Sequence, residues 1–330
     1  MARFYFRDTF VGNNSQTMRG ILSLKYPIER GTITNWEDIE EIWNYTFDES
    51  LGIFPSEHEI IFLGDRHDHS NHYHTEKMMQ IMFERFGVPA FYSGAQDGYT
   101  LSATGRGYAG IIIDIGAGLT RIIPISQGEA IQDKCLFMNL GGIDFDNIVA
   151  NYLPTVEQNI CYHVSREIGR KLKEKSCFVP YFSGGASQPK TKVASLLPDG
   201  TLVKLDGDFC KCGEGLFDPK ILGLDEKGID LSLIDVLKDF SPEMQKKLCR
   251  NVVVCGGTTA MAGFVERFKK NLYALHKERI NFNIIDMSSK AILPWIGGSI
   301  FSLSSAFDEL KTSKQEYEET GEMHLARCSN

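Results

Sequence analysis

The segment that most constrains the fold of this chain is GIIIDIGAGLTRIIPIS, residues 110–126. An apolar run ends at Asp114, a tight turn carries Gly116 and Gly118, and a second apolar run follows. This pattern predicts two strands joined by a short turn, and an ordinary β-hairpin remains one explanation of it. Glycines admit positive φ and have no Cβ, so the turn's N–H groups can also converge on an anion. Asp114 beside the turn suits the divalent cation that accompanies phosphates.

On both sides of this hairpin, the sequence predicts helices that alternate with short strands. Strands are expected at 20–26, 60–63, 88–91 and 252–255, and helices at 34–47, 76–86, 95–103, 145–152, 165–177, 234–240, 242–250, 258–275, 295–304 and 306–311. Residues 184–192 are expected to form an exposed loop, and Pro198–Gly200 a turn between two strands. Such an alternation indicates an α/β architecture.

Length and charge narrow the class of protein. A chain of 330 residues is long for one core and suits two domains. Its net charge of −8 argues against direct nucleic-acid binding. No apolar run approaches the roughly 20 residues of a membrane span, so no membrane association is expected. Eight cysteines without regular spacing fit reduced thiols, which indicates the cytoplasm or the nucleus.

Five segments, in order along the chain, resemble actin. They are RGILSLKYPIERGTITNWEDIEEIW (19–43), KMMQIMFERFGVPAFY (77–92), IIIDIGAGLTRIIPI (111–125), VVVCGGTTAMAGFVERFKK (252–270) and PWIGGSIFSLSSAF with SKQEYEETG (294–321). The resemblance covers almost everything from about residue 11 onward, and the last segment is the most specific part of it. The chain is therefore identified as a divergent member of the actin family.

The resemblance implies the actin-like, ribonuclease H-like fold, in which two α/β lobes hold ATP or ADP with Mg or Ca in a cleft. Residues 1–104, completed by 293–330, correspond to the first lobe. Residues 105–140 and 225–292 correspond to the core of the second lobe, and 141–224 to its small subdomain. An enzyme of the wider ATP-cleft superfold, such as a sugar kinase or a heat-shock ATPase, shares this fold but lacks the most specific segment.

The resemblance also assigns roles to single residues. Asp114 falls on the aspartate that holds the cation through water, and Gln96 on the glutamine that helps to place the attacking water. The other positions that match the nucleotide site are Gly116, Gly118, Gly142, Arg170, Lys173, Glu174, Gly256 and Gly257. Arg170, Lys173 and Glu174 lie at i, i+3 and i+4 of one predicted helix and therefore share a face. A solvated helix face is the alternative for this trio, and a structural role is the alternative for Gln96.

A second set of positions matches the apolar groove of actin that receives actin-binding proteins and the next filament subunit. This set is Gly105, Arg106, Ile296, Ser299, Ile300 and Leu303. Its apolar members have helical spacing, which core packing would explain equally well. The four histidines between His67 and His74 have the density of a metal site. A polar surface loop is the expected explanation, since no cysteine accompanies them.

Several departures from the family pattern bear on activity. The first phosphate hairpin, expected upstream of residue 11, and much of the small subdomain of the first lobe are missing. A truncated gene model or an alternative start is one explanation. Ala117 stands where actin has a second aspartate, and Arg121 stands in place of a histidine. Ile143, Ala260 and Ile292 replace an arginine, a methionine and a tyrosine.

Phosphoryl transfer depends on positioning and charge stabilisation from all sides, so these departures predict weak or absent hydrolysis. The expected function is an actin-like cytoskeletal protein of the cytoplasm that binds ATP or ADP. Its expected partners are actin or copies of itself in a filament, and actin-binding proteins. The alternative is a non-polymerising scaffold subunit of a larger complex, associated with chromatin, which would place it in the nucleus, or with a motor.

Overall fold

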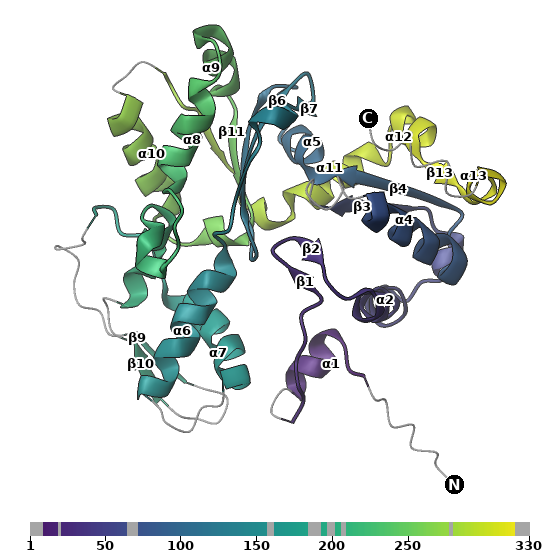
Figure 1. The fold of residues 1–330 in the computed structure, drawn as a ribbon, viewed down its shortest axis with the longest axis horizontal. Helices are drawn as coiled ribbons and strands as arrows, with labels where there is room; N and C mark the ends of the chain where they lie inside the picture. Colours follow the sequence, from purple (N-terminus) through teal and green to yellow (C-terminus); the bar gives the residue numbers. More distant parts are fainter. Residues whose placement is uncertain are drawn as a thin grey trace. The chain divides into compact units, whose positions relative to one another are not determined.

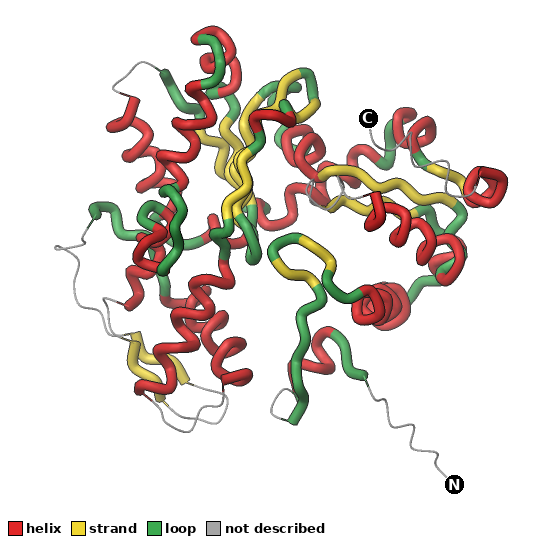
Figure 2. Tube along the Cα trace, viewed as in Figure 1, coloured by secondary structure: helices red, strands yellow, loops and turns green. Residues whose placement is uncertain are grey.

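The computed structural model describes residues 9–18, 21–64, 72–156, 162–183, 193–196, 202–205, 209–276 and 280–320. The chain divides into two compact units, Met1–Gln96 with Phe301–Asn330, and Asp97–Ile300. The boundaries predicted after residues 104 and 292 lie near the observed ones but do not coincide with them. Figure 2 shows that helices and strands alternate in both units, as the α/β prediction requires.

The unit 97–300 is built on a mixed sheet with the order β12-β11-β5-β6-β7, and β8 also pairs with β6 (Figure 1). The predicted hairpin is confirmed: β5 (Gly110–Ile115) pairs antiparallel with β6 (Thr120–Ser126). On the other edge of β5, β11 (Val252–Cys255) runs parallel to it. The remaining strands are β7 (Glu129–Ala130), β8 (Leu136–Met138) and β12 (Ile284–Asp286).

Helices cover both faces of this sheet, which explains why its central strands are apolar on both sides. Ile111 and Ile113 of β5 belong to a core with α8 (Ile229–Lys238) and α10 (Phe264–His276). Ile112 belongs to a second core with Leu101 of α5 (Gln96–Ser102) and Leu293 of α11 (Leu293–Phe301). In Figure 1, α8 and α10 lie on one side of β11, and α5 and α11 on the other.

Two longer helices, α6 (Gly142–Val156) and α7 (Tyr162–Ser176), pack against each other below one end of the sheet in Figure 1. The strands β9 (Val193–Leu196) and β10 (Leu202–Leu205) form an antiparallel pair. The remaining elements of this unit are η4 (Gln132–Lys134), η5 (Phe209–Leu216), η6 (Pro219–Leu222), α9 (Pro242–Leu248), η7 (Gly257–Ala260) and η8 (Lys290–Ile292).

The other unit contains a three-stranded sheet in which β4 (Ala90–Ala95) lies between β3 (Ile60–Gly64) and β13 (Thr312–Ser313). The C-terminal segment therefore completes a sheet begun more than two hundred residues earlier. The remaining elements are α1 (Gly12–Thr17), β1 (Ile28–Glu29), β2 (Thr32–Ile33), α2 (Trp36–Tyr45), η1 (Thr46–Leu51), η2 (Pro55–Glu57), α4 (His72–Gln80), η3 (Ile81–Arg85), α12 (Ser305–Leu310) and α13 (Lys314–Thr320).

Three local predictions are corrected by the structure. Residues 21–26 form no strand. The expected strand at 88–91 lies instead at 90–95. The expected helix at 258–275 is two elements, η7 and α10, because Gly263 between them has φ +83 and a helix cannot pass through that conformation. The N-cap of α2 is Asn35, whose side chain accepts from the Asp38 N–H at 3.1 Å.

The predicted loop at 184–192, the turn at 198–200 and residues His67 and His69 lie outside the described residues. His74 is buried in α4, where its ring meets Trp36 edge-on at a centroid distance of 5.3 Å. His74 is therefore part of the packed interior and not of a surface loop. Among the helices that the structure describes, none has the length and apolar character needed to cross a membrane.

Two buried thiols, Cys249 after α9 and Cys255 in β11, give a direct test of the packing around the sheet. Burial raises the pKa of Cys249 to about 12, and burial followed by the nearby Asp114 carboxylate raises the pKa of Cys255 well above its usual value. Only the thiolate reacts with iodoacetamide. We expect both cysteines to stay unmodified in the folded protein at pH about 8, because the thiolate fraction is far too small. Peptide mass spectrometry should find both modified after guanidinium unfolding, with the partly exposed Cys135 as the reactive control. Rapid modification of Cys249 or Cys255 in the folded state would contradict the described packing.

Candidate functional site

The turn between β5 and β6 packs against the N-terminus of α6. The Gly116 N–H donates to the Leu119 carbonyl at 3.0 Å, which closes the turn. The Gly142 N–H donates to the Gly116 carbonyl at 3.0 Å, and the Ile143 N–H donates to the Ala117 carbonyl at 2.8 Å. The turn's carbonyls at 116 and 117 are thus held by the first turn of α6.

Two glycines make this close approach possible. A Cβ at Gly141 would lie 2.5 Å from the Ala117 carbonyl oxygen. A Cβ at Gly142 would lie 2.9 Å from Thr258 Oγ1 and 3.1 Å from Lys173 Nζ. A side chain at Gly141 would push the turn away from α6, and one at Gly142 would displace the side chains of Thr258 and Lys173.

Lys173 and Thr258 connect two further elements to the same place. Lys173 Nζ donates to the Gly142 carbonyl at 3.1 Å and pairs with Asp146 of α6 at 2.7 Å. Thr258 Oγ1 donates to the Gly116 carbonyl at 2.8 Å. The β5–β6 turn, α6, α7 and η7 therefore meet around the Gly116 carbonyl and the Lys173 ammonium group.

The three predicted residues of α7 differ in their surroundings. Lys173 is buried, whereas Arg170 and Glu174 are exposed. Arg170 pairs with Glu167 one turn earlier at 3.0 Å. The trio is therefore not a uniformly solvated face: one cation lies at the β5–β6 turn, and two charged groups remain accessible beside it.

Gly256 and Gly257 follow β11, where the chain passes close to the end of β5. Gly256 has φ +87 and ψ 147, a conformation adopted essentially by glycine alone. A Cβ there would overlap Asp114 Oδ1 and the Ile115 carbonyl. At Gly257 a Cβ would meet no atom within 4 Å. Only the first glycine is required by the packing, and the second leaves open space beside the backbone.

This difference predicts that substitutions at the two neighbouring glycines affect stability very differently. Gly256→Ala should lower the free energy of unfolding by about 1–3 kcal/mol through backbone conformation alone, with the overlap at Asp114 adding to the loss. Gly257→Ala should change it by less than about 0.5 kcal/mol, since nothing lies near the added methyl group. Urea denaturation followed by circular dichroism measures both. Equal stability of the two variants would show that the approach of β11 to Asp114 is looser than described.

Asp114 makes an ion pair that the sequence analysis does not anticipate. It stands directly opposite Arg121 in the β5–β6 register, and Arg121 Nη2 contacts Asp114 Oδ2. Arg121 Nη1 pairs with Asp97 Oδ1 at 3.2 Å. The side chains of Arg121 and Asp97 are 2% and 0% exposed, respectively. Two signals could have pointed to this pair: an arginine inside the apolar run of β6, and an acidic residue at the start of α5.

The setting of Asp114 does not fit a divalent cation. Oxygen-rich sites hold Mg or Ca through several carboxylates and carbonyls, and Ala117 in the adjacent turn carries no carboxylate. Among the residues that the structure describes, no group of three or more His, Cys, Asp or Glu side chains could hold a metal ion. The guanidinium of Arg121 already occupies one oxygen of Asp114 and would repel a cation brought beside it.

The other predicted positions are placed as follows. Gln96 begins α5, is half-buried and belongs to the unit 1–96 with 301–330, so its position relative to Asp114 stays a prediction. Gly118 lies in the β5–β6 turn. Gly105 and Arg106 are exposed in the loop after α5, where Asn251 Nδ2 donates to the Arg106 carbonyl at 2.9 Å.

The residues expected in the partner groove divide between core and surface. Ile296 packs against the core that contains Leu293. Ser299 and Ile300 of α11 are exposed, and so is Leu303, which belongs to the other unit. The exposed Trp295 on α11 was not among the predicted residues. Core packing therefore explains Ile296 but leaves Ile300 and Leu303 unexplained.

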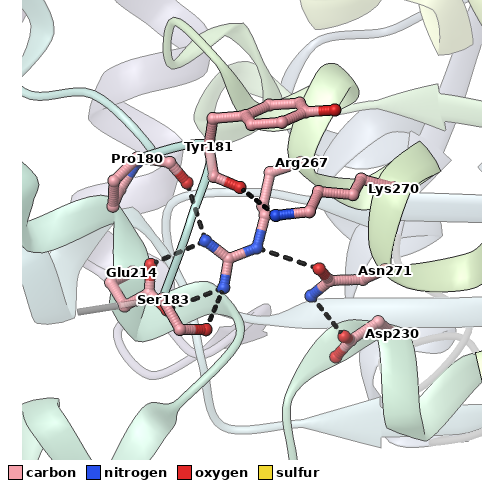
Figure 3. Close-up of polar contacts among 8 residues, drawn as sticks. All are labelled: Pro180, Tyr181, Ser183, Glu214, Asp230, Arg267, Lys270 and Asn271. Atoms are coloured by element: carbon pink, nitrogen blue, oxygen red, sulfur yellow. Dashed lines mark hydrogen bonds and ion pairs between the residues drawn. The ribbon is translucent and has the colours of Figure 1, made fainter. Parts of the chain in front are cut away.

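A second buried arginine, Arg267 of α10, organises a separate polar network in the same unit (Figure 3). Its two Nη atoms pair with Glu214 at 2.8 and 3.1 Å, and they also donate to the Pro180 carbonyl at 2.7 Å and to Ser183 Oγ at 2.6 Å. Its Nε donates to Asn271 at 2.9 Å, and Asn271 donates in turn to Asp230 at 2.7 Å. All five guanidinium N–H donors are satisfied, as a structural role requires.

The comparison with known families agrees with this architecture. The model of the Actin family matches residues 4–329, nearly the whole chain. Proteins of this family generally bind ATP or ADP with a divalent metal ion, and they associate with copies of themselves or with actin-related partners. The mixed α/β fold, with its central hairpin and the two glycines after β11, fits that match. The chain belongs to the actin family.

Proposed function

We propose that this chain is an actin-like protein of the cytoplasmic cytoskeleton that binds ATP or ADP through the unit 97–300. The observation that carries the proposal is the convergence of the β5–β6 turn, α6, α7 and η7 around Lys173. Four segments that are distant in the sequence place a glycine turn, a buried ammonium group and an open backbone at one point. Such a combination suits a polyphosphate.

The phosphates would lie against the turn that carries Gly116 and Gly118. Lys173 supplies a positive charge beside that turn, and its contacts with Gly142 and Asp146 hold the ammonium group in place. Gly257 leaves the backbone at the start of η7 unobstructed, so a ligand can approach it. The adenosine would lie along α7, where the exposed Arg170 and Glu174 offer a donor and an acceptor for the ribose and the base.

Hydrolysis is proposed to be weak. Ala117 contributes no carboxylate to order water, and Arg121 is held away from solvent by its two carboxylate partners. Because phosphoryl transfer depends on such groups more than ground-state binding does, affinity should survive better than turnover.

Isothermal titration with ATP and with ADP tests the nucleotide site. Arg170→Ala should weaken binding about tenfold, the usual loss for one hydrogen bond to a charged group. Lys171→Ala is the matched control, since Lys171 is the exposed neighbour on the same helix but outside the predicted face, and it should bind as the parent chain does. No detectable heat or thermal shift with either nucleotide would overturn the proposal. Phosphate release at the rate of ordinary actin would overturn the proposed weak hydrolysis.

Association with filaments is the second part of the proposal. It is supported by the exposed apolar side chains of Trp295 and Ile300 on α11, which a partner would cover. Sedimentation with Mg-ATP and salt, alone and with actin filaments, tests it. Pelleting that is lost in Ile300→Asp supports filament association. Recovery in the supernatant under every condition favours the alternative, a scaffold subunit that does not polymerise.

A further inference from the structure

We infer that Arg121 serves as a built-in cation of the nucleotide site, so that the unit 97–300 takes ATP or ADP without a divalent metal ion. The inference rests on the proposed nucleotide binding and adds the chemical form of the ligand, a metal-free nucleoside polyphosphate. It is carried by the ion pairs of Arg121 with Asp97 and Asp114.

The oxygens of Asp114 already have neighbours within the protein. Oδ2 contacts Arg121 Nη2. Oδ1 lies where a Cβ on Gly256 would overlap it, so the backbone of that glycine closes the other side. A metal-bound water would need room and lone pairs at these same atoms. The carboxylate is thus engaged before any ligand arrives.

The guanidinium is a permanent charge and cannot leave. Arginine stays protonated in proteins, and both of its partners are nearly fully shielded from water, with Asp97 completely buried. Moving Arg121 aside would take its guanidinium away from the fully buried carboxylate of Asp97, which is costly. A divalent ion that displaced Arg121 from Asp114 would therefore also break the buried ion pair between Arg121 and Asp97. The ion pair with Asp97 therefore holds Arg121 in place beside Asp114.

Arg121 acts on the nucleotide indirectly. It is too deeply buried to touch a phosphate, so it is a positioning residue and not a catalytic one. Asp114 is the penultimate residue of β5, two residues before Gly116 of the turn. An unpaired carboxylate there would repel the phosphates, and a divalent ion ordinarily cancels that repulsion. Here the guanidinium offsets part of that repulsion, since its single positive charge is shared between Asp97 and Asp114.

The test compares nucleotide binding in EDTA with binding in Mg²⁺. Titration calorimetry of the parent chain should give ATP affinities that agree within about threefold in the two buffers. Binding that needs Mg²⁺, with a loss of about tenfold or more in EDTA, would overturn the inference. Absence of binding in both buffers would instead overturn the proposed function, and the two failures are therefore distinct.

A double variant, Asp97→Ala with Arg121→His, removes the internal cation together with its buried partner. We expect its ATP affinity to fall about tenfold in EDTA and to be restored by Mg²⁺. Unchanged affinity in EDTA for a folded double variant would contradict the role of Arg121. If this variant does not fold, the comparison in the parent chain still decides.

A readout without nucleotide completes the test. In electron paramagnetic resonance with Mn²⁺ alone, the parent chain and the Asp114→Asn variant should give the same signal of bound Mn²⁺. Bound Mn²⁺ in the parent chain that disappears in this variant would place a cation at Asp114 and overturn the inference. This measurement tests for a cation at Asp114 independently of the nucleotide titrations.

Discussion

Arg121→Met is expected to lower the free energy of unfolding of the unit 97–300 by about 3–5 kcal/mol, the range for breaking a buried ion pair. The methionine fills most of the volume but removes the guanidinium that pairs with the buried carboxylates of Asp97 and Asp114. Like charges held close together in a medium of low polarity also repel each other. Urea denaturation followed by circular dichroism measures the loss.

The matched control also removes Asp97, one of the two carboxylates that pair with Arg121. Asp97→Ala combined with Arg121→Met should be more stable than Arg121→Met alone, because only Asp114, the less buried of the two carboxylates, then loses its ion pair with Arg121. If the free energy of unfolding of Arg121→Met lies within about 1 kcal/mol of that of the parent chain, water reaches Asp97 and the ion pair behaves as a surface pair.

Arg267→Met is expected to have an effect of the same size, about 3–5 kcal/mol, for a related reason. Glu214, whose side chain is 13% exposed, would lose both of its contacts with Arg267. The Pro180 carbonyl and Ser183 would each lose a donor as well. Since these groups come from separate segments, we expect η5 and the segment around Pro180 to separate from α10 (Figure 3).

Two further variants show whether charge or shape is responsible. Arg267→Lys keeps the charge but cannot supply five donors in a planar arrangement, so it should also be clearly destabilised. Lys270→Met changes a neighbouring, half-buried cation of the same helix, which donates to the Tyr181 carbonyl and lies over the Phe182 ring. It should lower the free energy of unfolding by much less than Arg267→Met does. Hydrogen exchange should locate the loss in residues 209–216 and at the N-terminal half of α10. If Arg267→Met and Lys270→Met have the same unfolding midpoint, the network around Arg267 does not stabilise the fold as described.

Local patterns were enough to predict much of the fold. The hairpin at 110–126 is confirmed because its apolar runs, its two glycines and its β-branched residues all favour the same local structure. The helices at 145–152 and 165–177 are confirmed within longer elements, since their apolar spacing is clear over two turns or more. The break between η7 and α10 was missed because Gly263 sits among good helix formers, and only its contact with Val179 imposes a positive φ.

The amino-acid sequence was sufficient to identify the family, most of the strands and helices, and the segments that could form a nucleotide site. Those properties depend on neighbours in the chain and on a pattern of residue types shared with the family. The pairing of charges became visible only in the folded protein: Asp97 with Arg121, Lys173 with Asp146, and Arg267 with Glu214. The partners are 24 or more residues apart, and a buried charge finds whichever opposite charge the packing brings within reach.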